Sequence, residues 1–90
     1  MIPNNITRDH ILQALFDIDR EGVPPHRKST RYSLVENGRM YPPKYVITLS
    51  NRYANGQELS SFEFHGGPEA NDFIASRGFE IVDEDGNRWE

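Results

Sequence analysis

The chain has 90 residues, a net charge of −4 and no cysteine. This length suits one small domain with a single core, and without cysteine there is neither a disulfide framework nor a thiolate metal site or nucleophile. No apolar run is longer than Tyr45-Val46-Ile47, which excludes a membrane span, and the N-terminus lacks the features of a secretory signal. We therefore expect a cytoplasmic protein.

Charge is distributed unevenly along the chain. Residues 26–57 hold six cations against the single acid Glu36, whereas residues 58–90 hold two cations and nine acids. A basic middle beside an acidic C-terminal part indicates one face for an anion and another for solvent or a partner. The overall acidity argues against tight non-specific binding to nucleic acid, which depends mainly on neutralising phosphates.

The first predicted element is a helix from about Thr7 to Glu21, with Thr7 as its N-cap and Gly22 as its stop. Helical spacing predicts a buried stripe of Ile11, Leu12, Leu15 and Ile18, with Ala14 and Phe16 beside it. The side predicted to face solvent holds Gln13, Asp17, Arg20 and Glu21.

A polar, cationic loop follows, His26-Arg27-Lys28-Ser29-Thr30-Arg31. It is either a solvated surface loop or a loop that contacts phosphates, in which arginine and lysine neutralise charge and the hydroxyls donate hydrogen bonds.

A β-hairpin is predicted next, because Asn37-Gly38 suits the two positive-φ positions of a type I′ turn. Its strands are residues 32–35 and 39–41. Alternation puts Arg39 and Tyr41 on one face and Met40 on the other, and we expect Met40 to be buried with Leu34 and Ile81.

Two prolines mark the joint between the hairpin and a second helix, predicted from about Pro43 to Tyr53 and stopped by Gly56. The apolar positions Val46, Leu49 and Tyr53, together with Ser50, share one face of this helix. Lys44 lies in the first turn, where the helix dipole disfavours a cation. It is either a solvated lysine whose stem lies on Tyr41, or a functional residue.

The remaining elements are short. Ser60 is a possible start of one helical turn, with Leu59, Phe62 and Phe64 directed into the core. A third helix runs from about Pro68 to Ser76 and buries Ala70, Phe73 and Ile74, and residues 79–82 form a strand. The predicted fold is α+β: three helices on a short, mostly antiparallel three-stranded sheet, in the order α-β-β-α-α-β. Trp89 so near the end of the sequence suggests a module, residues 1–90 with a core of about 6–82, that is part of a longer multidomain protein.

No catalytic constellation is apparent, so we do not expect an enzyme. The three histidines lack metal-ligand spacing, and Asp83-Glu84-Asp85 lacks the pattern of a calcium loop. His65-Gly66-Gly67 at the start of the third helix is either a tight turn or a weak anion cradle. We expect no cofactor and no metal.

Four blocks in fixed order resemble the N-terminal head domain of ScoMcrA-like restriction endonucleases. They are Tyr41-Pro42-Pro43-Lys44-Tyr45-Val46-Ile47-x-Leu49, Tyr53-Ala54-x-Gly56-x-x-Leu59, Phe64-x-Gly66-Gly67-x-x-Ala70-x-x-Phe73 and Gly78-Phe79-x-Ile81. Those proteins are modification-dependent (type IV) enzymes whose nuclease is a separate C-terminal HNH domain. The HNH motif is absent from this sequence, so the resemblance implies a DNA-associated accessory or recognition module that accompanies a nuclease domain.

Two functions are consistent with the sequence. The first is weak, salt-dependent DNA binding within a restriction or defence system, in which cations meet phosphates and two tyrosines stack on a base or pack against a sugar. Its candidate residues are Arg27, Lys28, Arg31, Arg39, Tyr41, Lys44, Tyr45 and Arg52. The second is a protein-interaction or scaffold domain that docks through its acidic C-terminal half.

Overall fold

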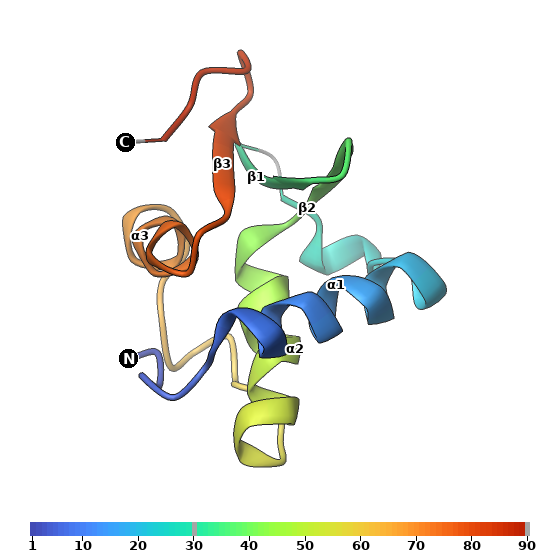
Figure 1. The fold of residues 1–90 in the computed structure, drawn as a ribbon, viewed down its shortest axis with the longest axis vertical. Coiled ribbons are helices and arrows are strands. Elements are labelled where there is room, and N and C mark those ends of the chain that lie inside the picture. The colour runs from blue at the N-terminus through green and yellow to red at the C-terminus, as the bar shows by residue number, and fades with distance from the viewer. Residues whose placement is uncertain (30, 90) are drawn as a thin grey trace.

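A computed structural model describes residues 1–29 and 31–89 of the chain. Within these residues the helices are α1 (Arg8–Glu21), α2 (Pro43–Asn55) and α3 (Pro68–Ser76), with a short 3-10 turn η1 (Pro25–Arg27). The strands are β1 (Tyr32–Glu36), β2 (Arg39–Tyr41) and β3 (Glu80–Asp83). The predicted α+β class and element order are confirmed (Figure 1).

The sheet has the strand order β2-β1-β3, and both pairings are antiparallel. The hairpin turn has φ values of 53° at Asn37 and 77° at Gly38, as a type I′ turn requires. Leu34 lies opposite Tyr41 on one side and opposite Ile81 on the other. These three side chains are buried and form one row on the face of the sheet that packs on the helices.

The ends of α1 and α2 follow from local chemistry. Thr7 and His10 form a capping box at the start of α1, in which each side chain accepts a hydrogen bond from the other residue's backbone N–H. Pro43 is the first residue of α2, where a missing N–H costs nothing. Gly56 ends α2 at a φ of 86°, in the left-handed region that glycine adopts without steric cost.

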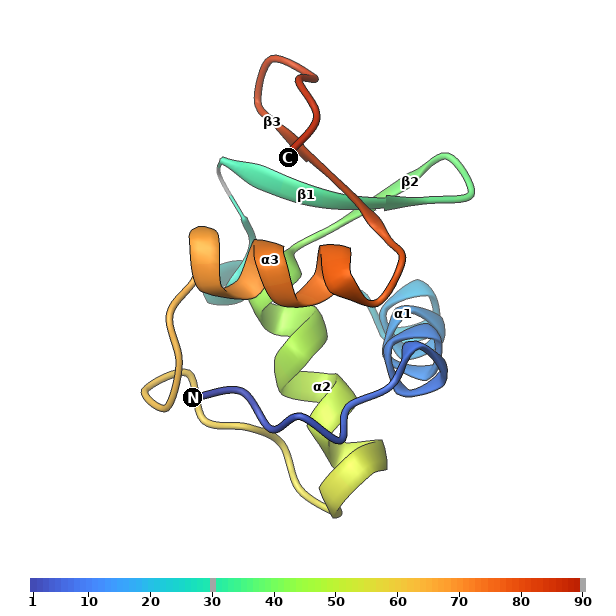
Figure 2. The ribbon, with the colours of Figure 1, turned by 60° about the vertical axis from the view of Figure 1, so that its left-hand side comes forward.

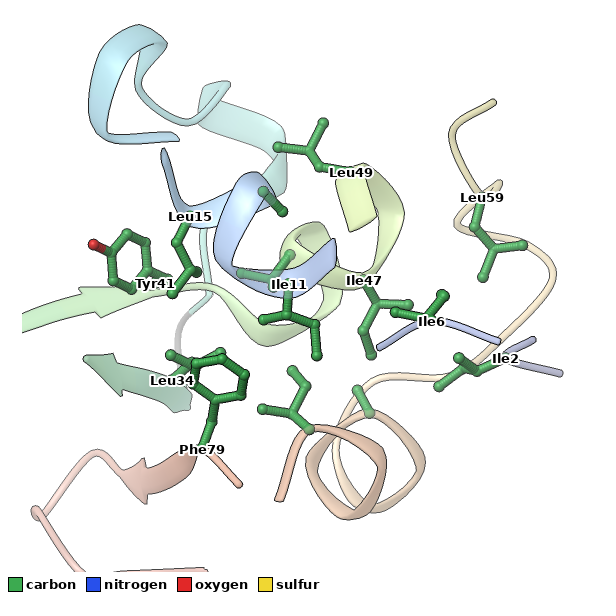
Figure 3. Packing of buried hydrophobic residues seen from close by; sticks show 14 of the residues in the cluster. Ile2, Ile6, Ile11, Leu15, Leu34, Tyr41, Ile47, Leu49, Leu59 and Phe79 are labelled. Carbon is green, nitrogen blue, oxygen red and sulfur yellow. The ribbon is translucent and has the colours of Figure 1, made fainter. Parts of the chain in front are cut away.

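Helix α2 occupies the centre of the molecule, where it contacts α1, α3 and β1 (Figures 1 and 2). The sequence predicts one buried face, yet all residues of α2 from Val46 to Asn51 are buried. Ile47 packs among Ile6, Ile11 and other residues of one hydrophobic cluster (Figure 3). Surrounding elements cover α2 on several sides, so the polar residues Thr48, Ser50 and Asn51 are buried together with its apolar face.

The predicted burial of Met40 is wrong. Met40 is 67% exposed, whereas Tyr41 is 5% exposed and belongs to the hydrophobic cluster. Alternation allows either assignment, and hydropathy alone favours methionine inside. The register decides otherwise, because Tyr41 lies opposite Leu34, and its hydroxyl finds a partner in Asp19 of α1.

Four further expectations about exposure are wrong. Phe16 is 65% exposed and Phe62 is 97% exposed, although both were expected beside or within the core. Leu12 is 37% exposed at the edge of the α1 stripe. Asp17, expected in solvent, is 5% exposed because α2 packs across that side of α1.

The C-terminal segment folds back onto β3 and α3. The Trp89 backbone N–H donates to the carbonyl of Ile81, and its indole Nε1–H donates to Asp72 at 2.8 Å. The indole ring meets Tyr32 edge-on, with ring centroids 5.4 Å apart.

None of the helices described has the length and apolar content that a bilayer crossing requires.

Candidate functional site

A surface pocket of about 570 Å³ lies where the loop after η1 meets the N-terminal turns of α2 and α3. We call it the basic pocket. Its lining comprises His26, Arg27, Lys28, Ser29, Arg31, Tyr32, Pro42, Pro43, Lys44, Ser61, Gly66, Gly67, Pro68 and Asn71. The predicted cationic loop and the predicted proline joint, which are separate in the sequence, therefore form one site.

Four of the predicted site residues line this pocket: Arg27, Lys28, Arg31 and Lys44. Lys44 Nζ donates to the carbonyl of Ser61 at 2.9 Å. Arg27 Nη2 donates to Thr48 Oγ1 at 2.8 Å. Within residues 1–29 and 31–89 no ion pair joins any of the four to a carboxylate, so their positive charges are not neutralised there.

The other predicted site residues have different surroundings. Arg39 forms an ion pair with Asp19 at 3.0 Å, and Arg52 pairs with Glu58. Tyr45 is half-buried, with the Arg27 guanidinium 5.2 Å from its ring centroid. Arg39, Tyr45 and Arg52 do not line the basic pocket.

Tyr41 presents no open ring face on which a base could stack, because it is buried and donates a hydrogen bond to Asp19 Oδ1 at 2.9 Å. Burial and then this hydrogen bond raise the pKa of Tyr41 to about 12. This hydrogen bond links β2 to α1, so Tyr41 has a structural role and is not part of the proposed binding surface.

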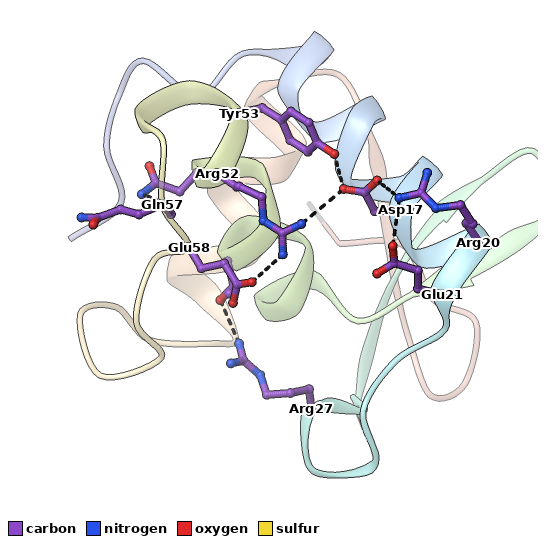
Figure 4. Close-up of polar contacts among 10 residues, drawn as sticks. Asp17, Arg20, Glu21, Arg27, Arg52, Tyr53, Gln57 and Glu58 are labelled. Carbon is purple, nitrogen blue, oxygen red and sulfur yellow. Dashed lines mark hydrogen bonds and ion pairs between the residues drawn. The ribbon is translucent and has the colours of Figure 1, made fainter.

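A polar network around Asp17 ties α1 to α2 (Figure 4). The buried carboxylate accepts hydrogen bonds from Arg20 Nη2 at 2.9 Å and from the Tyr53 hydroxyl, and Arg52 lies 3.9 Å away. The hydrogen bond to Asp17 raises the pKa of Tyr53. This network lies outside the basic pocket, and its groups bind one another.

The helices α2 and α3 both begin at the basic pocket. Pro43 and Pro68 are their first residues, and neither helix has a side-chain N-cap. Each helix therefore begins at the pocket with uncapped backbone N–H groups and the positive end of its dipole, which in α3 is partly offset by Glu69 in the first turn. Lys44, unfavourably placed by the dipole of its own helix, adds to this positive field.

Sequence reasoning missed Asn71. Its side chain is fully buried, and neither Nδ2 nor Oδ1 has a hydrogen-bond partner within the described chain. It nevertheless lines the basic pocket. The spacing could have identified it: Asn71 lies three residues before Ile74 on the buried face of α3, where an amide has to find a partner.

No group of three or more His, Asp or Glu side chains is positioned to hold a metal ion in the part of the chain that the structure describes. The expectation of no cofactor or metal stays a prediction. What the described residues do offer at the pocket is positive charge and the first backbone N–H groups of α2 and α3.

The fold and the pocket define a small α+β module with a cation-rich pocket at two helix N-termini. The model of a family described as ScoMcrA-like, N-terminal head domain, matches residues 4–83, so the chain belongs to this family. The resemblance seen in the four sequence blocks is confirmed. No curated protein and no solved structure matches the chain.

Proposed function

We propose that the chain is a non-catalytic DNA-binding or DNA-sensing module of a restriction or defence endonuclease, and that it accompanies a nuclease domain. One observation carries this proposal: Arg27, Lys28, Arg31 and Lys44 converge on one pocket with no carboxylate paired to them in the described chain. Membership of the head-domain family favours a DNA-related role.

The expected mode of binding is contact with phosphates. The Lys28 and Arg31 side chains are exposed and able to follow a backbone, whereas Arg27 and Lys44 are held by hydrogen bonds to Thr48 and Ser61. Four contacts to duplex DNA correspond to a slope of about −3.6 in a plot of log K against log salt concentration. The net charge of −4 opposes tight binding, so the affinity should be modest.

The test is a fluorescence-anisotropy titration with short duplexes, unmodified and with modified cytosine or adenine, at two salt concentrations. Lys28→Glu is the principal variant, because its ammonium has no partner among the described residues. Lys44→Glu is the second. Arg88→Glu is the matched control, since it makes the same charge change at a separate hollow beside the hairpin and Gly78.

We expect both lysine variants to bind at least tenfold more weakly than the wild type, with a shallower salt slope, and Arg88→Glu to bind nearly as the wild type does. An equal loss in all three variants would mean that net charge alone matters, and the pocket would not be the DNA site. Absence of binding to every duplex at low salt would refute the proposal.

A second candidate is docking to a protein partner through the acidic C-terminal half. Phe62, which is 97% exposed within that half, is the observation that favours it, because an exposed aromatic side chain in a charged surface suits an interface anchor. Under this alternative Phe62→Ser would abolish association with the partner nuclease domain in a pull-down, while Lys28→Glu would have no effect on it.

A further inference from the structure

We infer that Phe62 stacks on a base of single-stranded DNA whose phosphates are held at the basic pocket. This inference rests on the proposed DNA-binding function and adds a contact that only an unstacked base can make. It starts from the side chain of Phe62, which is 97% exposed in the segment between α2 and α3 (Figure 2).

The tyrosines near the pocket are poorly placed for stacking. Tyr41 is buried, and Tyr45 is half-buried with the Arg27 guanidinium over its ring. Tyr32, which lines the pocket, is also half-buried. Phe62 differs from all three, because its nearly complete exposure leaves the ring open to a base.

The turn that contains Phe62 adjoins the basic pocket. Ser61, the preceding residue, lines the pocket, and adjacent Cα atoms are about 3.8 Å apart. The Ser61 carbonyl accepts the hydrogen bond from Lys44 Nζ at 2.9 Å. Phe62 therefore lies one residue away from the contact that positions a cation of the proposed phosphate site.

Hydrogen bonds and buried neighbours fix this turn without covering the ring. The Glu63 N–H donates to the Ser60 carbonyl at 3.0 Å, and the Phe62 N–H donates to Ser60 Oγ at 3.2 Å. Leu59 and Phe64 are both buried in the hydrophobic cluster. Because the backbone of the turn is already ordered, stacking on Phe62 restricts little more than its own side-chain torsions.

The charges around the site place a phosphate and a base in different positions. Residues 58–69 hold three acids and no lysine or arginine, whereas the four cations of the basic pocket belong to residues 27–44. Glu63, next to Phe62, accepts a hydrogen bond from the Ser60 N–H through its carboxylate at 3.2 Å. This acid disfavours a phosphate beside Phe62 and has no such effect on an uncharged base.

The surroundings of Phe62 favour a base over a protein partner. Within residues 60–65 no second apolar side chain is exposed, because Phe64 is buried and the other neighbours are the polar residues Ser60, Ser61, Glu63 and His65. An anchor of a protein interface depends on packed neighbours that exclude water, whereas stacking requires only one open ring face. A duplex covers the faces of its bases with neighbouring base pairs, so the ligand that Phe62 contacts is single-stranded.

The experiment measures anisotropy with three labelled ligands: a thymidine oligonucleotide, an abasic strand of the same length and charge, and a duplex. The wild type should bind the thymidine strand about fivefold or more tightly than the abasic strand, as expected for one stacked base. Phe62→Ser should bind these two strands alike and should bind the abasic strand and the duplex as the wild type does. Phe62→Trp should keep the preference, because it retains an aromatic face.

Two control variants separate stacking from other effects. Phe16 is 65% exposed on α1 and does not line the basic pocket, so Phe16→Ser should bind all three ligands as the wild type does. Lys28→Glu should weaken binding to all three ligands and reduce the salt slope, while the ratio between the thymidine and abasic strands stays the same. An equal loss for both strands in Phe62→Ser would overturn the inference.

A measurement on the unaltered protein does not depend on any variant. The ring proton resonances of Phe62 should move upfield when the thymidine strand is added, because a stacked base contributes its ring current, and should stay in place with the abasic strand. DNA binding without this shift and without a preference for the thymidine strand would overturn the inference and leave the proposed function standing. Failure to bind any of the three ligands would overturn both, and unchanged DNA binding by Phe62→Ser together with lost association with the nuclease domain would assign Phe62 to a protein interface.

Discussion

Tyr41→Phe should make the protein less stable than the wild type at neutral pH and more stable in strong alkali. The pKa of Tyr41 is raised from an ordinary value of 10.0 to about 12. The cause is burial, reinforced by the hydrogen bond to Asp19. Both favour the neutral phenol, so folding stabilises this group fully below pH 10 and loses that contribution as the pH rises through 12.

The magnitude follows from linkage. A pKa of about 12 against 10.0 corresponds to about 2.7 kcal/mol of folding stability that is lost on full ionisation. Phenylalanine loses the hydrogen bond to the Asp19 carboxylate, which costs about 1.5 kcal/mol at neutral pH. The two proteins should therefore have equal stability near about pH 11, and their order should reverse above it.

Urea unfolding at a series of pH values between neutrality and strong alkali measures this difference, and the tyrosinate absorbance of wild type minus that of Tyr41→Phe reports the ionisation of Tyr41. Asp19→Asn is the control, because it removes the carboxylate and leaves Tyr41 buried. In Asp19→Asn the pKa of Tyr41 should fall only part of the way to its ordinary value. A constant difference between wild type and Tyr41→Phe at every pH would refute the reasoning.

Three other predictions concern stability, each measured by urea unfolding at neutral pH. Asp17→Ala should cost about 2 kcal/mol, because the buried carboxylate accepts two hydrogen bonds from charged or phenolic donors; a cost below about 0.5 kcal/mol would contradict this. Ile47→Ala should cost about 2–5 kcal/mol in the core, whereas Phe62→Ser should stay within about 0.5 kcal/mol. Gly78→Ala should cost more than Gly56→Ala: both glycines have positive φ, but a Cβ at 78 would lie 2.9 Å from Arg8 Nη1 and push it off its hydrogen bonds to the carbonyls of Arg77 and Gly78, whereas one at 56 meets nothing. Equal costs would show that backbone strain alone matters.

The elements of the fold could be predicted because one or two residues determine where each helix or hairpin begins or ends. Asn37-Gly38 fixed the hairpin, Gly56 fixed the end of α2, and Pro68 fixed the start of α3. Each depends on a φ preference or a missing N–H that is a property of one or two residues. Such features do not depend on what the rest of the chain does.

The exposure of individual side chains was harder to predict, because it depends on residues far away in sequence. Tyr41 is inside because its hydroxyl meets Asp19, 22 residues earlier. Asp17 is inside because Tyr53 and Arg52 of α2 reach it. Hydropathy at one position contains no information about such partners, so it placed Met40 and Asp17 on the wrong sides.

The candidate site was predicted only in part for the same reason. The charge pattern identified Lys28, Lys44 and the cations near them. It did not show that four cations share one pocket, or that Arg39 and Arg52 pair with acids. Asn71 was missed although its spacing to Ile74 places it on the buried face of α3. The site is formed by segments that are distant in the sequence, and composition does not show that α3 is one of them.

The position of Trp89 means that the protein contains its own optical probe. Trp89 is the single tryptophan of the chain, and its ring packs edge-on against Tyr32, which lines the basic pocket. Its indole N–H is held by Asp72, the residue next to Asn71. A ligand that enters the pocket and displaces Tyr32 should therefore change the intrinsic emission, so occupancy can be followed by fluorescence without a label on either protein or DNA.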